Sequence, residues 1–591
     1  RAEQQDLEHQ EDLGVMFVHP LLALALVGGV ASSTKTRATT APKKDAPNVV
    51  LLFADDLGFG DPGFAGHPSN LTPNLDALRA SGRRLSTWYS GCPVCTGSRA
   101  SLMTGRVYSR VGVPGVFGPT SQSGLPLREV TLADQFRTAG YETGMLGKWH
   151  LGQREAYLPA SRGFDSYLGI PFSDDMGAAR LSDCGNGTTI PATVTGDWSR
   201  AAYAAHGYTQ ALRFEDEASD RGGRFLPLVS QSKGATTVVE QPVDLTHLQE
   251  KYAAFATDFI GSAKKKFFFY AALSHVHTTQ GNLPDKQYAG CAFRGTSIRG
   301  PFGDALAEAD DLVGSIVGAV DGAGLRERTL FVFSSDNGPW MVQAESAGSV
   351  GHLYARSAGY WNVGKGSTWE GGIREPAFVS WKGVVEENSQ SAAAVSSTDV
   401  FPTLSKLIGA PLPTTLTYNG SSEPAIYDGV DQSSVWFGGA GTSARDEAGD
   451  CLFFFGGPHG ADAPSAARCG PYKLHYATGP GLAGCDGCEK QYYDPPMVFQ
   501  VEVDPSEQFP LTKNNTRHYA DAAINDVLAM AAKSLKAYSA TYAAGELTPA
   551  NGGVAPDADA EVVNGTALYG VCCDRQAADT CDCDGKPYPG R

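Results

Sequence analysis

A cysteine and an arginine, four positions apart, are the residues best suited to chemistry in this sequence. They lie in the segment Cys92-Pro93-Val94-Cys95-Thr96-Gly97-Ser98-Arg99, which is typical of the start of a helix. Free backbone N–H groups and the positive end of the helix dipole favour negative charge at such a start. Cys95 and Arg99 therefore predict an anion-binding site that includes a cysteine.

Two acidic pairs follow apolar segments that are typical of buried strands. Asp55-Asp56 comes after residues 48–54, and Asp336-Asn337 comes after residues 329–334. Adjacent carboxylates repel unless a cation lies between them, and hard divalent cations prefer oxygen ligands. Each pair alone also fits a solvated turn. Together the four side chains predict one site for Ca²⁺ or, as the weaker alternative, Mg²⁺.

Isolated cations follow other expected strands. Lys148 and His150 lie two positions apart, so an extended backbone would put them on one face. Lys365 lies between two glycines, which permit close backbone approach to a ligand. His277 follows the apolar run 266–273. Each alone fits a surface charge or a core histidine, whereas their shared position after strands indicates one site.

Several segments, in order, resemble the sulfatase family, arylsulfatase type. The segments that carry the resemblance are 72–76, 98–106, 147–152, 169–173, 300–304, 336–339, 364–376 and the cysteine-rich ending 572–583. In that family the cysteine of Cys-x-Pro-Ser-Arg is oxidised to formylglycine, an aldehyde. Gly97 stands where the family has proline.

The resemblance implies a role for each residue. Cys95 becomes formylglycine and hydrates to a gem-diol, which Arg99 holds beside the metal. One diol oxygen attacks sulfur, and His150 deprotonates the other so that sulfate leaves. The expected metal ligands are Asp55, Asp56, Asp336, Asn337 and converted Cys95, and the expected substrate contacts are Lys148, Ser173, His277 and Lys365.

Three functions are compatible with these residues. The first is hydrolysis of sulfate esters, with a formylglycine-generating enzyme as partner during maturation. The second is a catalytically silent protein that binds sulfated glycans. Gly97 makes the unfolded segment more flexible, so binding to the modifying enzyme costs more entropy, and Cys95 would then stay unconverted in such a protein. The third, a phosphatase or phosphodiesterase, would need Ser or Thr and two metals. The sequence does not identify the leaving group, and the substrate is expected to be a sulfated small molecule, glycolipid or glycan.

Alternating strands and helices must position these residues. They predict an α/β fold, and the resemblance implies an alkaline-phosphatase-like central mixed sheet with helices on both faces. Short strands expected at 452–455, 472–476 and 497–503, without long helices between them, predict a smaller antiparallel sheet toward the C-terminus. We expect a leader at 1–46, a catalytic domain at 47–445 and a C-terminal subdomain with a cysteine-rich tail at 446–591. A net charge of −17 over 591 residues argues against nucleic-acid binding, which needs a basic surface.

An apolar segment after Met16 predicts a signal peptide and export, to a lysosome-like compartment or outside the cell; the alternative is a short membrane anchor. The chain has twelve cysteines, which we expect to form disulfides along this oxidising route. We prefer this interpretation to redox or zinc sites at 92–95 and 485–488. Sequons for glycosylation occur at Asn70, Asn186, Asn419, Asn514 and Asn564. The sequence leaves association into a homo-oligomer open, because no motif decides it.

Overall fold

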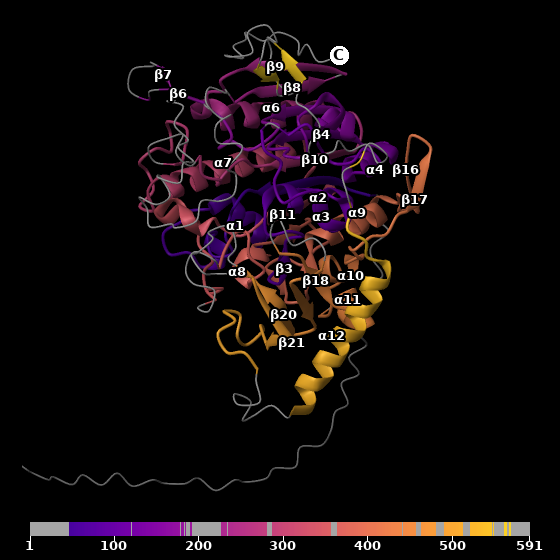
Figure 1. Ribbon diagram of the computed structural model, residues 1–591. Helices are drawn as coiled ribbons and strands as arrows, with labels where there is room; N and C mark the ends of the chain where they lie inside the picture. The colour runs from indigo at the N-terminus through magenta and orange to yellow at the C-terminus, as the bar shows by residue number, and fades with distance from the viewer. Residues whose placement is uncertain are drawn as a thin grey trace, which may run out of the picture. The chain divides into compact units, whose positions relative to one another are not determined.

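A ten-stranded mixed sheet is the framework of the computed structural model (Figure 1), and strand β1 (Asn48–Ala54) is the fifth strand in its order. The structure describes residues 46–119, 121–177, 179–182, 184, 189–191, 226–232, 234–279, 286–355, 363–439, 441–456, 463–479, 490–511, 521–545, 548, 561–563 and 566–568, all within the compact unit 41–591. Residues 1–45 of the expected leader, with its signal segment, and the cysteine-rich tail lie outside these residues.

The sheet order places four strand ends side by side. In order the strands are β14 (Ser389–Ser391), β2 (Arg83–Leu85), β13 (Phe378–Ser380), β11 (Thr329–Ser335), β1, β10 (Phe267–Ala272), β4 (Glu142–Gly147), β5 (Ser166–Gly169), β8 (Leu228–Ser232) and β9 (Ala235–Glu240). From β11 through β5 all neighbours pair in parallel, whereas the β11–β13 and β5–β8 pairs are antiparallel. The carboxyl ends of β11, β1, β10 and β4 therefore meet at one edge, where α/β sheets carry their sites.

Helices cover both faces of the sheet, which confirms the predicted fold class. Alternate residues of β1 point to opposite faces. Val49, Leu51 and Phe53 pack in one core with α2 (Cys95–Thr104), α4 (Leu132–Thr138) and α9 (Val400–Ile408). Val50 and Leu52 pack in the other with α1 (Pro73–Ala80), α6 (Leu248–Ser262) and α7 (Pro301–Gly322).

A second, antiparallel sheet contains β18 (Leu452–Phe454), β19 (Ala466–Cys469), β20 (Tyr472–Thr478) and β21 (Gln491–Phe499). Helix α12 (Asp521–Thr541) packs on it through Val527 and Ala531. The strand expected at 497–503 was misplaced: it begins at Gln491 and ends at Phe499, because the chain then turns and the Val503 N–H donates to the Gln500 carbonyl. A Cys451–Cys469 disulfide joins β19 to the residue before β18, and a second disulfide links Cys184 to Cys291.

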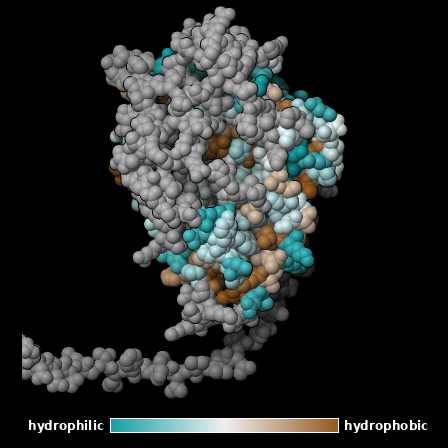
Figure 2. Space-filling model, in the orientation of Figure 1, coloured by the Kyte–Doolittle hydropathy of each residue, from teal (hydrophilic) through white to brown (hydrophobic). Residues whose placement is uncertain are grey.

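Short elements connect the two sheets. A three-stranded sheet contains β12 (Arg374–Glu375), β3 (Trp88–Tyr89) and β15 (Val395–Ser396). Helix α8 (Glu370–Ile373) directly precedes β12, and helix α3 (Tyr108–Val111) packs against α2. Other short elements are the hairpin β16 (Thr415–Tyr418) and β17 (Ser421–Pro424), β6 (Arg180–Ser182), β7 (Thr189–Pro191), α10 (Ser433–Trp436), α11 (Ala444–Ala448), β22 (Glu561–Val563) and β23 (Thr566–Leu568). Hydrophobic and hydrophilic residues are mixed on the face in Figure 2, and within the described ranges no helix has the length and apolar character to cross a bilayer.

Candidate active site

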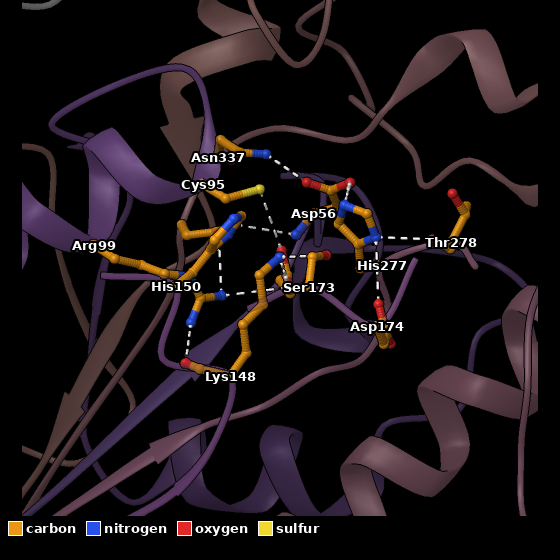
Figure 3. Close-up of polar contacts among 12 residues, drawn as sticks. Asp56, Cys95, Arg99, Lys148, His150, Ser173, Asp174, His277, Thr278 and Asn337 are labelled. Atoms are coloured by element: carbon orange, nitrogen blue, oxygen red, sulfur yellow. Dashed lines mark hydrogen bonds and ion pairs between the residues drawn. The ribbon is translucent and has the colours of Figure 1, made fainter. Parts of the chain in front are cut away.

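The chemistry-bearing residues meet where the parallel strands end (Figure 3). Asp55 and Asp56 follow β1, and Asp336 and Asn337 follow β11. The remaining residues come from the ends of β4 and β10, the loops after β5 and β11, and the start of α2: Lys148, His150, His277, Ser173, Lys365, Cys95 and Arg99. Each of these side chains is buried, so their interactions are only weakly screened by solvent.

The two acidic pairs lie in direct contact. The Asp56 backbone N–H donates to Asp336 Oδ1 at 3.1 Å, and Asn337 Nδ2 donates to Asp56 Oδ1 at 2.7 Å. Asp56 has a positive φ of 55°, which turns the chain directly after β1. Asn337 Oδ1 is buried and has no hydrogen-bond partner among the described residues. An oxygen ligand is therefore available beside the carboxylates.

Three cations face the three carboxylates. Arg99 Nη2 lies 2.9 Å from Asp336 Oδ2 and 3.5 Å from Asp55 Oδ2. Lys148 Nζ lies 2.6 Å from Asp55 Oδ2 and 3.0 Å from Ser173 Oγ. Lys365 Nζ lies 2.6 Å from Asp56 Oδ1. The formal charges of these six side chains cancel.

These neighbours shift the pKa values in opposite directions. Burial would raise the pKa of Asp55, but nearby Lys148 and the other cations lower it below its usual range. Burial and the Asp55 charge raise the pKa of Asp336 to about 7. Burial would lower the pKa of Lys148, which Asp55 instead raises. Asp56 raises the pKa of Lys365 in the same way. Lys148 and Lys365 are therefore cations throughout the neutral range.

Cys95 is the first residue of α2 and points into the cluster. Its Sγ lies 3.8 Å from Asp55 Oδ1. Burial raises the pKa of the Cys95 thiol to about 12, although Lys148 and Lys365 act to lower it. The thiolate is the nucleophilic form of cysteine. An unmodified Cys95 is therefore a protonated, weakly reactive thiol at neutral pH.

His277 lies between Lys365 and a further acidic pair, Asp174-Asp175. Its Nε2 is 3.0 Å from Lys365 Nζ, and its Nδ1 is 2.8 Å from the Thr278 carbonyl oxygen. A carbonyl only accepts, so Nδ1 carries the proton and Nε2 of the neutral ring accepts from Lys365. Burial and the Lys365 charge lower the pKa of His277. Sequence analysis missed Asp174, whose Oδ1 lies 3.6 Å from Nδ1; its only signal was its place after Ser173.

The expectation that Lys148 and His150 share a face of extended backbone is wrong. His150 has a positive φ of 59°, because its backbone N–H turns to donate to the Pro171 carbonyl at 3.0 Å. Its Nε2 then lies 2.9 Å from the Phe117 carbonyl oxygen, which fixes the proton on Nε2. His150 Nδ1 is buried without a hydrogen-bond partner in the described part of the chain. Burial and Lys148 lower the His150 pKa well below its usual value.

Other predicted residues differ in exposure. Asn419 is exposed at the turn between β16 and β17, whereas Asn70 is buried and its Nδ2 donates to the Asp61 carbonyl oxygen at 3.0 Å. A glycan on Asn70 would require this side chain to leave its position. Asn186, Asn514 and Asn564, with the cysteines at 485 and 488, lie outside the described residues. Cys92 and Cys95 are both buried and free.

Comparison with known proteins shows the family. The sulfatase family model matches residues 47–410, and the model for the C-terminal region of aryl-sulfatase matches residues 447–583. The chain belongs to the sulfatase family. It is 38% identical to human arylsulfatase A over 506 residues, which cover 83% of this chain and 86% of that protein. This sulfatase is also 38% identical to canine arylsulfatase G, over 80% of this chain and 82% of the relative.

A solved structure supports the same assignment. The PsFucS1 sulfatase from Pseudoalteromonas sp. has a TM-score of 0.62 and 26% identity to this sulfatase, covering 84% of this chain and 90% of the other. The relatives are named arylsulfatases, and this sulfatase is accordingly a sulfuric ester hydrolase.

Proposed function

We propose that this sulfatase hydrolyses sulfate esters through Cys95 converted to formylglycine, beside one divalent cation. The observation that carries the proposal is the position of Cys95, whose Sγ lies 3.8 Å from Asp55 within a cluster of carboxylates and cations. The high pKa of its thiol argues for conversion, because an unmodified Cys95 would offer little nucleophile. An aldehyde carbon at this position would supply a reactive centre that can be regenerated in each cycle.

The residues present fit a hard divalent cation. Asp55, Asp56, Asp336 and Asn337 offer oxygen donors, and Asn337 Oδ1 is buried without a partner in the described structure. Such donors suit Ca²⁺, with Mg²⁺ as the alternative. When bound, the cation would supply positive charge beside position 95. Because the six charged side chains otherwise cancel, the loaded site would be cationic and suited to a sulfate monoester.

Lys148, Ser173 and Lys365 would bind the sulfate oxygens. Lys148 Nζ and Ser173 Oγ lie 3.0 Å apart, so both would contact the same sulfate oxygen. Arg99 donates to the Lys148 carbonyl oxygen at 2.9 Å and to Asp336, which fixes its guanidinium behind the carboxylates. This arrangement would orient the ester before reaction, and fixed donors lower the barrier where charge grows.

Lys365 and His277 would serve the leaving oxygen. The neutral His277 ring carries its proton on Nδ1, so the proton for the leaving group would come from the Lys365 ammonium, directly or through His277 Nε2. His150 offers a different atom, its unprotonated Nδ1, as a base near position 95. The two histidines thus have separate tasks, set by which ring nitrogen faces a carbonyl.

The proposed setting is the secretory pathway, ending in a lysosome-like compartment or outside the cell. The apolar segment after Met16 and the Cys184–Cys291 and Cys451–Cys469 disulfides support it. A formylglycine-generating enzyme would act on Cys95 before folding buries it. The substrate is proposed as a sulfated glycolipid, glycan or small aryl ester. Assembly into a homo-oligomer stays a prediction.

Mass spectrometry of the peptide that contains Cys95 tests the proposal together with sulfate release from an aryl sulfate. We expect the aldehyde mass in protein made in a secretory host, and sulfate release that a chelator abolishes. An intact thiol in all molecules, with sulfated-glycan binding but no turnover, would favour the silent alternative that Gly97 suggests. Release of phosphate but not sulfate would favour the phosphatase alternative.

A further inference from the structure

Gly97 leaves space beside the first turn of α2, and the side chains of Cys92 and Tyr108 fill it, with the Cys92 sulfur nearest. A Cβ atom at position 97 would lie 2.5 Å from Cys92 Sγ and 3.0 Å from both Cys92 Cβ and Tyr108 Cγ. Nonbonded heavy atoms attract at about 3.5–4.0 Å, so 2.5 Å is a severe overlap. The Cys92 thiol therefore occupies the place that a side chain at position 97 would take.

The sulfur is held firmly in this place. Cys92 is a free cysteine with 2% exposure, and it packs in one core with Val94, Tyr108 and Phe455. Its pKa is raised by burial, while hydrogen bonds with the Val94 backbone and the Tyr108 side chain act to lower it. Cys92 is thus a protonated packing group and not a second nucleophile.

The segment from Cys92 to Cys95 connects to both sides of the site. Val94 is the N-cap residue of α2 and makes no side-chain capping bond. The Pro93 carbonyl accepts from the Gly366 N–H at 2.8 Å, directly beside Lys365. The Gly97 N–H donates to the Gly115 carbonyl at 3.2 Å, a bond that proline could not make. A displacement of Cys92 would therefore move Cys95 and Lys365 relative to each other.

We propose that Cys92 is a positioning residue that is matched in size to Gly97, and that this pair sets the direction of Cys95 at the start of α2. The inference rests on the proposed function for its effect on catalysis, but the packing itself does not depend on that function. The glycine at position 97 is then compatible with a well-formed site, because the Cys92 sulfur supplies the missing volume.

Two backgrounds test the pair by thermal unfolding. Gly97 lies inside a helix without a positive φ, so alanine there would normally stabilise through helix propensity. In the native background we expect Gly97→Ala to lower Tm, because overpacking destabilises. In a Cys92→Ala background, the same change should lower Tm less, because the 2.5 Å overlap is gone and only the 3.0 Å approaches to the Cβ of residue 92 and to Tyr108 Cγ remain. Equal shifts in both backgrounds would overturn the proposal.

Gly261→Ala is the matched control, because position 261 lies in α6 and a Cβ there meets no atom within 4 Å. Its effect on Tm should be the same in the native and in the Cys92→Ala background. Cys92→Ser, which keeps most of the volume, should lower Tm less than Cys92→Ala.

Catalysis supplies a readout that packing alone would not move. We expect kcat per converted Cys95 to fall about tenfold to 100-fold in Gly97→Ala, with a smaller change in KM, and to recover in the Cys92→Ala double variant. The aldehyde content of each variant is measured by mass spectrometry for this normalisation. An unchanged normalised kcat in a variant with lowered Tm would refute the positioning role. If wild-type protein carries no aldehyde, the proposed function fails, while the Tm comparison still decides the pair.

Discussion

Replacement of Lys365 by methionine separates the lysine's part in catalysis from its part in the charge balance. Lys365 Nζ lies 2.6 Å from Asp56 Oδ1 and 2.9 Å from Oδ2, and 3.0 Å from His277 Nε2. Methionine keeps the length of the side chain and removes the charge and the donor. If Lys365 stabilises charge on the leaving oxygen, kcat should fall about 10²–10³-fold, or roughly 3–4 kcal/mol, while the loss of its contact with a sulfate oxygen should raise KM.

The same variant should bind a divalent cation more tightly. At an effective dielectric constant of about 20, unit charges 2.6 Å apart interact by roughly 6 kcal/mol, which is an upper bound for the contact between Lys365 and Asp56. Without metal, Asp56 loses this partner, and the free energy of unfolding should fall by about 3–5 kcal/mol. A bound cation would replace the lost charge, so addition of Ca²⁺ after chelator treatment should raise Tm more in Lys365→Met than in wild type.

The assay is sulfate release from an aryl sulfate, with Tm recorded at several Ca²⁺ concentrations. Lys406→Met is the matched control, because Lys406 is an exposed lysine paired with Asp431. The reasoning would be refuted by a folded, Ca²⁺-loaded Lys365→Met protein whose kcat lies within about threefold of wild type, which is less than about 1 kcal/mol of barrier. Equal Ca²⁺ stabilisation of both proteins would refute the electrostatic part alone.

Three further changes test other parts of the molecule. Cys95→Ala should abolish sulfate release while Tm changes little, since Cys95 lies among polar side chains and not, like Cys92, in an apolar core; residual turnover would contradict the role of Cys95. Burial and Lys148 lower the pKa of His150 in the folded state. Below pH 6.5, the usual pKa of histidine, the unfolded state therefore binds a proton that the folded state does not, and the free energy of unfolding should fall with decreasing pH. A scan of Tm against pH should show less of this loss in His150→Gln. Lys473→Met leaves Glu370 and Glu507 buried without their lysine and should cost about 3–5 kcal/mol in urea unfolding, unlike exposed Lys490→Met.

The strand ends of the site could be predicted from sequence because parallel strands bring their carboxyl ends to one edge. Asp55 and Asp336 are far apart in the chain, yet both directly follow buried apolar strands that pair in parallel. Apolar runs mark such strands strongly, since both faces of the sheet are covered. The position of these carboxylates thus follows from local patterns and one topological rule.

Contacts between side chains could not be predicted in this way. The left-handed turn at His150 depends on a hydrogen bond to Pro171, and the packing of Cys92 on Gly97 depends on the tight first turn of α2. Neither has a periodic signal in the sequence. The boundaries of β21 were similarly missed, because a strand in a small antiparallel sheet ends where a turn begins and not where apolar residues end.

The charge balance of the site explains how an acidic protein can accept an anion. The chain carries a formal net charge of −17, a field that would repel a sulfate ester. Within the cluster, Arg99, Lys148 and Lys365 cancel Asp55, Asp56 and Asp336, so the described site is close to neutral. Neutrality removes local repulsion but gives no attraction. A divalent cation among the carboxylates would give the site two net positive charges, and burial would keep that charge unscreened. Binding of the substrate should therefore depend on prior binding of the metal, and sulfated ligands should lose affinity when the metal is removed even where no turnover occurs.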